Sequence, residues 1–334
     1  MNDPQISIVI PCYNEEKTIQ ALLEAIRGQT FPLEELEVII ADGFSTDNTR
    51  KRIQEYSIAH PELRVQLVDN ERKVIPAGLN LAIHAARGKI IVRMDAHAVP
   101  ALDYIERSVR ALKDGLGDNV GGVIDIHPGS TGWIARSIAV ATAHPLGVGD
   151  ARYRWAKTAG ESDTVAFGCY YKSTVERVGY YNESLFVNED YEFNARLRAL
   201  GFKIWVDPAI RALYYSRPSL RLLARQYFTY GFWKVRMLRL FPKTLRWRQA
   251  IPPLFVLWLL MLLLLSIFWI PALWVLLTTL VWYCLVLIVG SMGHGLRQKK
   301  GSLLLGIPIA IITMHLSWAM GFWISLFRPS HSGK

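Results

Sequence analysis

Ile6-Ser-Ile-Val-Ile10, followed directly by Pro11-Cys-Tyr-Asn-Glu15, is the stretch of sequence that decides the fold. Four of its first five residues are Ile or Val, and such a short apolar run is typical of a strand that is buried on both faces. Similar runs occur at 36–41, 64–68 and 89–94, and stretches with helical periodicity separate them, at 14–27, 45–56 and 76–86. Strands that alternate with helices predict an α/β fold with a mostly parallel sheet and right-handed crossovers.

The ends of the predicted helices carry recognisable residues. We expect Asn14 and Ser45 to cap the first two helices, and Pro76 to open the third. The same polar residues follow strands, and ligands of parallel sheets bind beyond the carboxyl ends of their strands. Each cluster also has a purely structural explanation as a cap, a first-turn acid or a turn, and this alternative stays open for each of them.

Acidic residues follow three of the four strands. They lie in Pro11–Glu15, in Asp42–Asp47 and in Asp95-Ala-His97. Carboxylates that gather at one edge of a sheet repel each other unless they bind a cation or the hydroxyl groups of a ligand. The chain has neither GxxxxGK[ST] nor a GxGxxG after a strand, so it lacks the phosphate loops of P-loop and dinucleotide-binding proteins. Asp95 and His97, two positions apart, could instead hold one divalent ion.

Composition divides the 334 residues into two parts. The chain is 51% hydrophobic and 20% charged, which excludes a disordered protein. Up to Asp207 it has 23 basic and 28 acidic residues, whereas the remaining 127 residues have 15 basic residues and no acidic one. This asymmetry indicates a membrane-associated second part, and we expect no nucleic-acid partner. Three cysteines without a CxxC spacing predict neither a disulfide framework nor a cysteine zinc site.

No Lys, Arg, Asp or Glu occurs between Gln249 and Leu296. At about 1.5 Å per helical residue this run is long enough for two membrane crossings. We predict spans at 252–270 and 272–290, joined by a tight turn at Pro271, and a third span at 303–326. The third run contains many Gly, Ser and Trp residues, so a re-entrant or interfacial helix is the alternative there. Basic residues flank the first two spans, which predicts cytoplasmic flanks.

A basic and aromatic segment, 216–250, precedes the first span. Its Arg and Lys residues interleave with Tyr, Phe and Trp, so we expect amphipathic helices in the headgroup region. An ordinary basic helix that packs on the preceding domain is the alternative. The first residues, Met1–Gln5, are polar, and the apolar run after them is too short for a signal peptide. We therefore expect a cytoplasmic domain at 1–215 and a membrane region at 251–334.

Five motifs, in order over about 200 residues, resemble the inverting family 2 glycosyltransferases. They are Ile8-Val-Ile-Pro-Cys-Tyr-Asn-Glu15, Asp42-Gly-Phe-Ser-Thr-Asp-Asn-Thr49, Ala77-Gly-Leu-Asn80 with Ala86-Arg-Gly88, Met94-Asp-Ala-His97, and Asn188-Glu-Asp190 with Arg196-Leu197 and Gly201. The resemblance implies the GT-A fold of nucleotide-diphospho-sugar transferases, a Rossmann-like mixed sheet. The Asp-Ala-His form and the C-terminal spans look most like the membrane-anchored branch that contains the succinoglycan glucosyltransferase.

The resemblance implies roles for residues at the strand ends. Pro11, Tyr13, Glu15 and Asp42 would hold the base and ribose of the nucleotide sugar, and Asp95 and His97 would bind a Mn²⁺ or Mg²⁺ ion that bridges the diphosphate. The family usually has an acidic residue where His97 stands, which leaves the choice of metal open. Arg72 and Lys73 could neutralise the diphosphate, and Gly168 would belong to the wall of the donor-sugar site. Glu189 is assigned to the nucleotide-sugar site.

Asp190 is the predicted catalytic base. Inverting transfer needs one carboxylate to take the proton of the acceptor hydroxyl. The alternative is that Glu189 and Asp190 are first-turn acids of a helix that Asn188 caps and Gly201 ends. The processive enzymes of the family carry a Gln-x-x-Arg-Trp motif, which the stretches around Gln226 and Trp247 do not match. We therefore expect the transfer of a single sugar.

The combined prediction is a membrane-bound hexosyltransferase of exopolysaccharide assembly. Its partners would be a nucleotide-sugar donor, a polyprenyl-diphosphate-linked saccharide as acceptor, the membrane and other proteins of polysaccharide assembly. It would be a multi-pass protein of the bacterial inner membrane. Two alternatives stay open: a polyprenyl-phosphate glycosyltransferase, and a non-catalytic membrane scaffold or channel subunit. Against a channel, the first two predicted spans contain no ionisable side chain except Tyr283 and Cys284.

Overall fold

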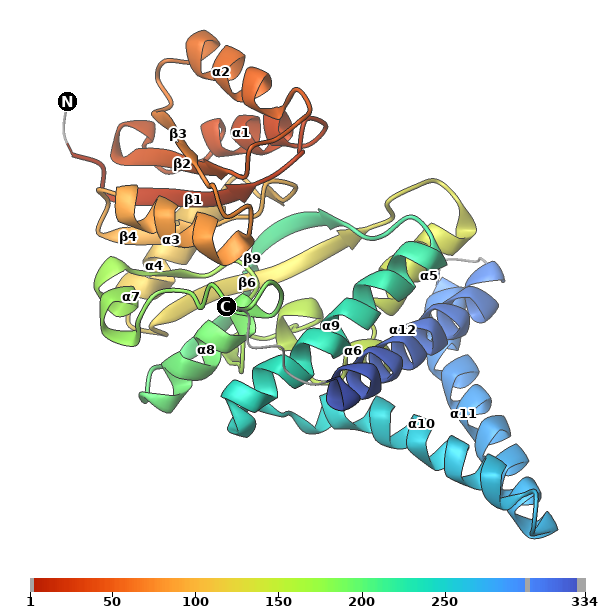
Figure 1. The fold of residues 1–334 in the computed structure, drawn as a ribbon. Coiled ribbons are helices and arrows are strands. Elements are labelled where there is room, and N and C mark those ends of the chain that lie inside the picture. The colour runs from red at the N-terminus through yellow and green to blue at the C-terminus, as the bar shows by residue number, and fades with distance from the viewer. Residues whose placement is uncertain (1–2, 298–300, 329–334) are drawn as a thin grey trace. The chain divides into compact units, whose positions relative to one another are not determined.

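The computed structural model describes residues 3–297 and 301–328 (Figure 1). The chain forms two compact units. The N-terminal unit comprises Met1–Asp125 and Ala151–Tyr214, and the C-terminal unit comprises Ile126–Asp150 and Tyr215–Lys334. Residues 126–150, which lie inside the range predicted for the first domain, group with the C-terminal helices, because Ile138 and Ala141 share a cluster with Leu303 and Ile307.

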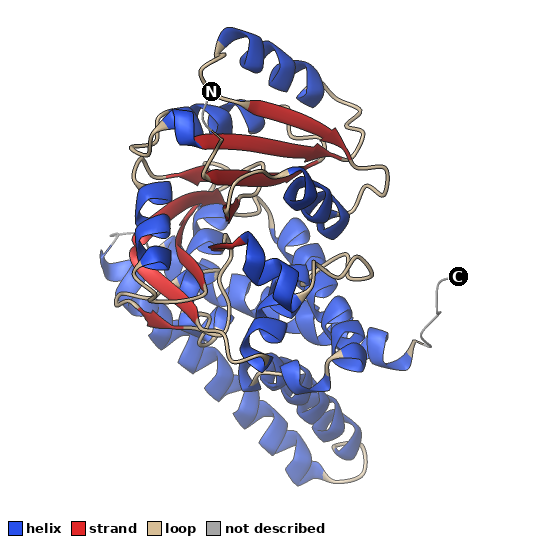
Figure 2. Cartoon of the chain, turned by 90° about the vertical axis from the view of Figure 1, so that its left-hand side faces the viewer, coloured by secondary structure: helices blue, strands red, loops and turns tan. Residues whose placement is uncertain are grey.

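One mixed sheet contains all the described strands, which Figure 2 shows in red. Its order is β3-β2-β1-β4-β8-β6-β9-β5, and β7 also pairs with β9. The strands are β1 Ile6–Cys12, β2 Leu36–Asp42, β3 Val65–Asp69, β4 Ile90–Arg93, β5 Val99–Pro100, β6 Asn119–His127, β7 Gly160–Glu161, β8 Cys169–Tyr171 and β9 Ile204–Tyr215. The first four are parallel, whereas β8 is antiparallel to both β4 and β6. The predicted mixed sheet is confirmed.

Six α-helices of the N-terminal unit connect these strands. They are α1 Ile19–Arg27, α2 Thr49–Ala59, α3 Ile75–Ala85, α4 Tyr104–Lys113, α7 Lys172–Val178 and α8 Glu189–Ala199, with 3₁₀ turns at Leu33–Glu35 and Arg152–Arg154. The predicted caps at Asn14 and Ser45 are wrong, because α1 and α2 begin later, after Thr18 and Asn48. Pro76 does lie in the first turn of α3, as expected.

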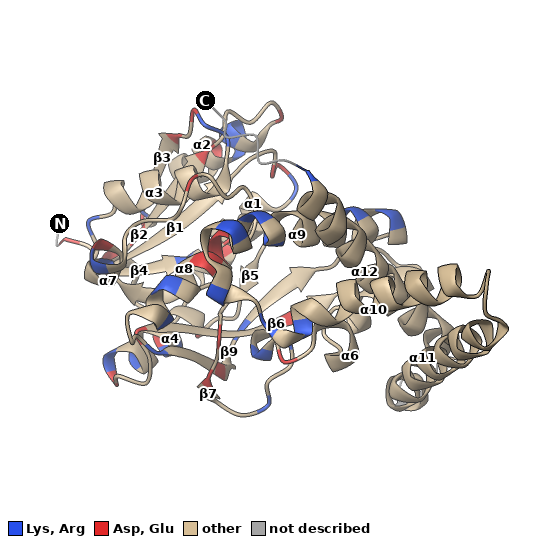
Figure 3. Cartoon of the chain, turned by 60° about the horizontal axis from the view of Figure 1, so that its bottom comes forward, with Lys and Arg blue, Asp and Glu red and all other residues tan. Residues whose placement is uncertain are grey.

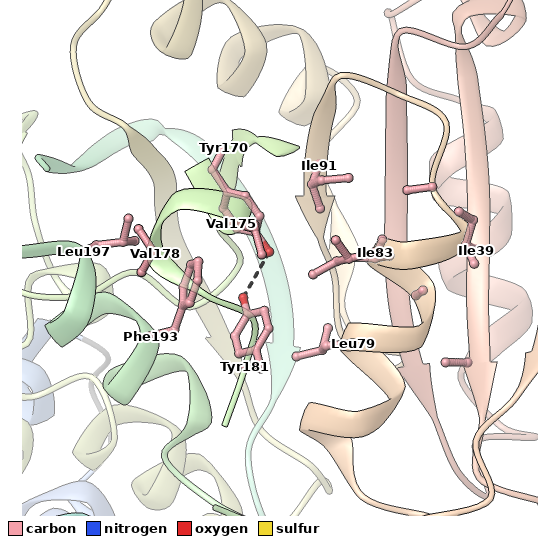
Figure 4. Packing of buried hydrophobic residues seen from close by; sticks show 14 residues of the cluster. Ile39, Leu79, Ile83, Ile91, Tyr170, Val175, Val178, Tyr181, Phe193 and Leu197 are labelled. Carbon is pink, nitrogen blue, oxygen red and sulfur yellow. Dashed lines mark hydrogen bonds between the residues drawn. The ribbon is translucent and has the colours of Figure 1, made fainter. Parts of the chain in front are cut away.

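Alternate residues of the parallel strands build the core on two faces. Val9, Ile39 and Ile91 lie in one cluster with side chains of α3 and α8, including Leu79 and Phe193 (Figure 4). The intervening residues Ile8, Ile10 and Ile40 are fully buried as well, as the two-residue period of a strand requires when both faces are covered. In the same cluster, the hydroxyl groups of Tyr170 and Tyr181 lie 3.0 Å apart.

A buried carboxylate stabilises the amino ends of the central strands. Glu37 on β2 accepts hydrogen bonds from Ser7 Oγ at 2.5 Å, from the backbone N–H of Arg87 at 2.7 Å and from Arg87 Nε at 3.0 Å. Burial alone would raise the pKa of Glu37, but these hydrogen bonds hold it below its ordinary value. Arg87 thus has a structural task far from the strand ends that carry the acidic clusters.

The C-terminal unit is helical. Its α-helices are α5 Trp133–Ala141, α6 Pro145–Val148, α9 Leu220–Leu240, α10 Trp247–Leu265, α11 Ile270–Arg297 and α12 Ser302–Phe327, with a 3₁₀ turn at Pro242–Thr244. Helices α10, α11 and α12 are long and apolar enough to cross a membrane, and Figure 3 shows them almost without charged residues. The bounds of these helices differ from those of the predicted spans, which stay a prediction. The turn lies at 266–269, and Pro271 is the second residue of α11, because proline suits the first turn of a helix.

Candidate active site

The carboxyl ends of β1, β2 and β4 lie at one edge of the sheet. The register pairs Cys12 with Asp42 and Val9 with Arg93, so the polar segments that follow these strands start next to each other. Among the described residues, the non-glycine residues with positive φ are Asn14, Phe44, Lys73 and Asn188, at 55°, 60°, 56° and 68°. Three of them follow β1, β2 and β3, and the fourth precedes α8. Left-handed non-glycine residues are typical of functional sites.

The loops after β1 and β2 are bonded to each other. The backbone N–H of Asn14 donates to Ser45 Oγ at 2.8 Å, and Asn14 Oδ1 accepts from the N–H of Thr46 at 2.8 Å. The N–H of Glu15 donates to Thr49 Oγ1 at 2.7 Å. Asn14 and Ser45 therefore hold two loops together rather than cap helices.

Of the residues predicted to bind the nucleotide, Tyr13 and Asp42 differ clearly in their exposure to solvent. Tyr13 is 49% exposed, and its ring lies beside Gly43, so it offers a surface on which a base could stack. Asp42 is fully buried, and it accepts hydrogen bonds from Ser45 Oγ at 2.5 Å and from Arg50 Nη1 at 2.9 Å. Asp42 therefore orders the loop after β2. Pro11 lies next to Ala41 of β2, below this loop.

His97 and Glu15 form a pair across the site. His97 Nδ1 lies 3.0 Å from Glu15 Oε1, and Thr18 Oγ1 donates to the other carboxylate oxygen of Glu15 at 2.5 Å. A carboxylate at one nitrogen of an imidazole fixes its ring orientation and its tautomer, as in metal-ligating histidines. The role of Glu15 at the nucleotide stays a prediction, and in this geometry its carboxylate also holds the His97 ring.

Arg93 joins the two acidic motifs. Its side chain, on the last residue of β4, is 5% exposed. Nη2 donates to Glu189 Oε1 at 2.9 Å and to Asp95 Oδ1 at 3.2 Å, and Nη1 lies 4.0 Å from Asp190 Oδ2. Nε and Nη1 form no hydrogen bond within the described part of the chain. One buried guanidinium thus faces three carboxylates, two of which belong to α8.

Glu189 and Asp190 occupy different environments at the start of α8. The Glu189 side chain is 7% exposed and that of Asp190 is 36% exposed. Burial, only partly offset by Arg93, raises the pKa of Glu189 to about 7, and desolvation raises the pKa of Asp190 as well. Asp190 is therefore the carboxylate that a ligand can reach. Asn188, the predicted cap, is left-handed and forms no capping hydrogen bond with its side chain.

Gly168 lies against a polar network that reaches α8. A Cβ atom on Gly168 would lie 2.3 Å from Asn119 Oδ1, so only glycine fits there. Asn119 Nδ2 donates to Asn194 Oδ1 at 2.7 Å, and Asn194 Nδ2 donates to Thr164 Oγ1 at 2.9 Å. The N–H of Arg93 also donates to the carbonyl oxygen of Gly168, at 2.9 Å. The stretch 165–168 is thereby held beside α8 and β4.

Arg72 is occupied by a protein partner. It forms an ion pair with Glu183, whose other carboxylate oxygen accepts from Asn80 Nδ2 at 2.8 Å. The Arg72 side chain is 62% exposed. Lys73 Nζ lies 5.7 Å from the centre of the Phe44 ring, in the next loop. Both bases thus lie at the strand ends, but Arg72 also ties the loop before α8 to the loop after β3.

The protein donors for a metal ion are few. Within the described ranges, no group of three or more His, Cys, Asp and Glu side chains could enclose an ion. Asp95 and His97 offer one carboxylate and one imidazole, which suits an ion that takes its other ligands from substrate phosphates and water. The residues present therefore fit a substrate-bridging ion rather than a metal held by the protein alone.

Four residues of this arrangement were missed in the sequence. Arg93, Asn119, Glu183 and Asn194 make contacts that position the site. Arg93 could have been noticed, because an arginine within a short buried strand needs an acidic partner. The other three carry no signal of their own, since their partners are far away in the sequence.

Solved structures with the same fold include glycosyltransferases. The chain matches the mannosyltransferase PcManGT of Pyrobaculum calidifontis, in complex with GDP-Man and Mn²⁺, at 20% identity with a TM-score of 0.63, over 98% of this chain and 88% of that chain. It matches S. aureus TarS 1-349, in complex with UDP-GlcNAc, at 17% identity with a TM-score of 0.51, over 92% of this chain and 91% of that chain. The predicted GT-A fold is confirmed.

Sequence relatives span the whole chain. The succinoglycan biosynthesis protein ExoA of Rhizobium meliloti is 32% identical over 96% of this chain and 94% of its own length. The dolichyl N-acetyl-alpha-D-glucosaminyl phosphate 3-beta-D-2,3-diacetamido-2,3-dideoxy-beta-D-glucuronosyltransferase of Methanococcus voltae is 29% identical over 98% of this chain and 99% of its own length. The model of the glycosyl transferase family 2 matches residues 7–173, which contain four of the five motifs. The chain therefore belongs to glycosyl transferase family 2.

Proposed function

We propose that this enzyme is an inverting hexosyltransferase that moves one sugar from a nucleotide sugar to a lipid-linked saccharide in exopolysaccharide assembly. The observation that carries the proposal is the convergence of Asp95, Glu189 and Asp190 on Arg93. It brings the motif expected to bind the donor diphosphate next to the carboxylate expected to act on the acceptor. The full-length similarity to ExoA supports the role in exopolysaccharide assembly.

Asp190 would act as the general base. Its carboxylate takes the proton of the acceptor hydroxyl, whose oxygen bonds to the anomeric carbon of the donor sugar. The bond between that carbon and the diphosphate oxygen breaks, and the nucleoside diphosphate leaves with the electron pair. The greater exposure of Asp190 supports its assignment over Glu189. Glu189, paired with Arg93, holds the guanidinium in place.

The donor would bind at the ends of β1, β2 and β4. Tyr13 contacts the base, with Pro11, Glu15 and Asp42 shaping its loops, and Gly168 lines the sugar. Asp95 and His97 would hold Mn²⁺ or Mg²⁺, which supplies positive charge against the leaving diphosphate. Glu15 keeps the His97 ring in its orientation. Arg72 and Lys73 add positive charge at the same edge.

The acceptor is a saccharide on a polyprenyl diphosphate in this proposal. The WfgD relative, 32% identical over 34% of this chain, is named for an α-D-GlcNAc-diphosphoundecaprenol acceptor. The Methanococcus relative is named for a dolichyl phosphate-linked sugar, so a monophosphate carrier is the second candidate. Membership in the family favours an enzyme over a scaffold or channel subunit. The long apolar helices support membrane anchoring. In this proposal the protein crosses the bacterial inner membrane more than once and its active site is cytoplasmic.

The test is the release of nucleoside diphosphate by the detergent-purified protein. A panel of nucleotide sugars is offered with Mn²⁺, Mg²⁺ or EDTA, with and without bacterial lipid extract. We expect turnover with one donor, its loss in EDTA, and a decrease of about 10²- to 10⁴-fold for Asp190→Asn. Asp114→Asn, an exposed residue at the end of α4, is the matched control and keeps full activity.

Product analysis distinguishes the two candidate acceptors and determines the configuration of the new glycosidic bond. Mass spectrometry of the extracted lipid product shows whether the new sugar lies on a diphosphate or a monophosphate carrier, and NMR of its anomeric proton shows inversion. An Asp190→Asn variant with wild-type turnover would refute the assigned base. Absence of turnover with every donor, together with no nucleotide binding by calorimetry, would refute the proposed function.

A further inference from the structure

Helix α9 runs alongside α12 over its whole length. Near its start, Leu223 lies in one cluster with Leu303 and Ile307 of α12. In the middle, a Cβ atom on Gly231 would lie 2.1 Å from the carbonyl oxygen of Trp318, so the two backbones touch. A Cβ atom on Gly321 would likewise lie 2.0 Å from the carbonyl oxygen of Phe228. The two helices thus run in the same direction, side by side.

The end of α12 is held by a charged side chain of α9. Arg239 Nη2 donates to the carbonyl oxygens of Ser325, Leu326 and Arg328, at 2.9, 3.1 and 3.0 Å. Since α9 contacts α12 from Trp318 to its end and Arg239 also bonds to Arg328 just beyond it, any orientation of α12 relative to a membrane is imposed on α9 as well.

Helix α9 is too strongly charged to cross a membrane. Its 21 residues include five bases, Arg221, Arg225, Lys234, Arg236 and Arg239. If α12 crossed the bilayer, α9 would have to cross with it, and its central bases would lie in the hydrocarbon region at a high cost in free energy. At a membrane surface the exposed bases, Arg221, Arg225 and Arg239, would face lipid phosphates, whereas Lys234 is buried in the protein.

Within the described residues, α10 and α11 contact α12 away from the tip of their hairpin, and Tyr283 Oη, in the middle of α11, lies 2.9 Å from His315 Nδ1 of α12. Trp318 Nε1 of α12 donates to the carbonyl oxygen of Gln249 at 3.1 Å, and Trp323 Nε1 donates to that of Pro253 at 3.0 Å. In the second half of α11, Leu287 belongs to the cluster of Leu303 and Ile307.

The other end of the hairpin has its own contacts. Leu262 of α10 packs on Ala272 and Leu276 of α11, and in Figure 1 this end lies away from α12. Helix α12 therefore lies across the part of the hairpin away from its tip, beside the start of α10 and the middle of α11.

The remaining face of α12 is an apolar stripe. Its exposed large apolar residues, apart from Leu326, recur every three, four or seven positions, at Leu305, Ile309, Leu316, Met320, Ile324 and Phe327. The opposite face of α12 is covered by protein. The buried share of its apolar segment is 44%, against 17% for that of α10 and 11% for that of α11. An amphipathic arrangement of this kind, one face on protein and one apolar face exposed, suits a helix that lies in a membrane interface.

We propose that α9 and α12 lie together in the plane of the membrane surface and that only the α10–α11 hairpin crosses the bilayer. The apolar stripe of α12 then faces the acyl chains, and the exposed bases of α9 face anionic lipid phosphates. The third predicted span becomes an interfacial helix. Arg328 comes to lie on the side from which α10 starts, whereas a crossing α12 would place it on the opposite side.

Cysteine labelling in the full-length protein tests this arrangement. Single cysteines are introduced at Lys243, Phe268 and Arg328 in a Cys284→Ser background, in which Cys12 and Cys169 are buried. A membrane-impermeant maleimide is applied to spheroplasts and to inverted vesicles. Lys243→Cys reports the side on which α10 starts, and Phe268→Cys reports the tip of the hairpin.

We expect Arg328→Cys to be labelled in the same preparation as Lys243→Cys and in the opposite preparation to Phe268→Cys. Labelling together with Phe268→Cys would overturn the proposal, because α12 would then cross. If the Arg328→Cys variant does not accumulate or stays unlabelled, fusions after Lys334 decide. Suppose that labelling places Lys243→Cys in the cytoplasm. A fluorescent fusion to green fluorescent protein, together with an inactive fusion to alkaline phosphatase, then supports the interfacial helix. A dark fluorescent-protein fusion with an active phosphatase fusion refutes it.

Discussion

Arg93 Nη2 lies 2.9 Å from Glu189 Oε1, although the two residues are 96 positions apart in the sequence. The pair is almost fully buried, and the same nitrogen reaches Asp95. The guanidinium therefore connects the end of β4 to the start of α8. In the proposed reaction Asp95 serves the donor diphosphate and Asp190 serves the acceptor hydroxyl. Both carboxylates lie next to the Arg93 guanidinium.

Replacing Arg93 tests whether it positions the reacting groups. Arg93→Met leaves Glu189 buried without its counter-charge, so we expect a loss of about 3–5 kcal/mol in stability and a decrease of at least about 100-fold in kcat. In the double variant Arg93→Met/Glu189→Gln, the buried charge is removed, and the melting temperature recovers while kcat does not. Full recovery of kcat in the double variant would show that Arg93 only neutralises Glu189.

His97 is expected to set the metal preference. Imidazole is a better ligand for Mn²⁺ than for Mg²⁺, whereas carboxylate suits both. His97→Asp should therefore lower the ratio of activity in Mn²⁺ to activity in Mg²⁺ by about tenfold, measured as diphosphate release at saturating donor. Glu15→Gln, which weakens the orientation of the ring, should raise the concentration of metal needed for half activity about 10- to 100-fold. An unchanged metal preference in His97→Asp would exclude His97 as a ligand.

Substitutions at Arg72 and Glu183 distinguish two roles of Arg72, binding of the donor and attachment of the loop before α8. If Arg72 contacts the diphosphate, Arg72→Gln raises the donor KM about 5- to 10-fold, by the loss of about 1–1.4 kcal/mol, with little change in kcat. Glu183→Gln breaks the same ion pair but leaves the cation, so its donor KM should stay near the wild-type value. Equal effects of the two substitutions would mean that the pair serves only to hold the loop before α8.

Glu37 predicts a pH dependence of stability. Its pKa is lower in the folded protein than its ordinary value of 4.5, so the ionised form is favoured by folding. This contribution is fully present above pH 4.5 and is lost as the pH falls through the lowered pKa. Glu37→Gln should cost about 2 kcal/mol at neutral pH and less in acid. Thermal unfolding at several pH values measures it, and a difference that grows in acid would contradict the assignment.

The close contact of α9 with α12 predicts that Gly231 does not tolerate a larger residue. Gly231→Ala places its Cβ atom against the backbone of Trp318, at 2.1 Å without movement, which should cost about 1–3 kcal/mol. Gly293→Ala in α11 is the matched control, since no atom lies within 4 Å of its Cβ position. Thermal unfolding in detergent compares the two. Equal melting temperatures would mean that α9 and α12 are not packed this closely.

Local pattern was sufficient for several features. The apolar runs around Ile8, Ile39 and Ile91 predicted the parallel strands, because burial on both faces requires such residues in a short segment. The absence of charge between Gln249 and Leu296 predicted two long apolar helices. The predicted helix caps were wrong because Asn14 and Ser45 form hydrogen bonds between two loops instead. Their partners lie in another loop, 31 residues away.

The sequence by itself determined the α/β fold, its polar strand ends and the apolar C-terminal helices, since each depends on residues close together in the chain. Only the tertiary structure decided which carboxylates meet at Arg93, that Glu15 orients His97, and that α9 lies along α12. Apart from the contact of Arg93 with Asp95, these relationships join residues 80 or more positions apart. A local pattern reports burial and periodicity, whereas the choice of a distant partner depends on how the whole chain packs.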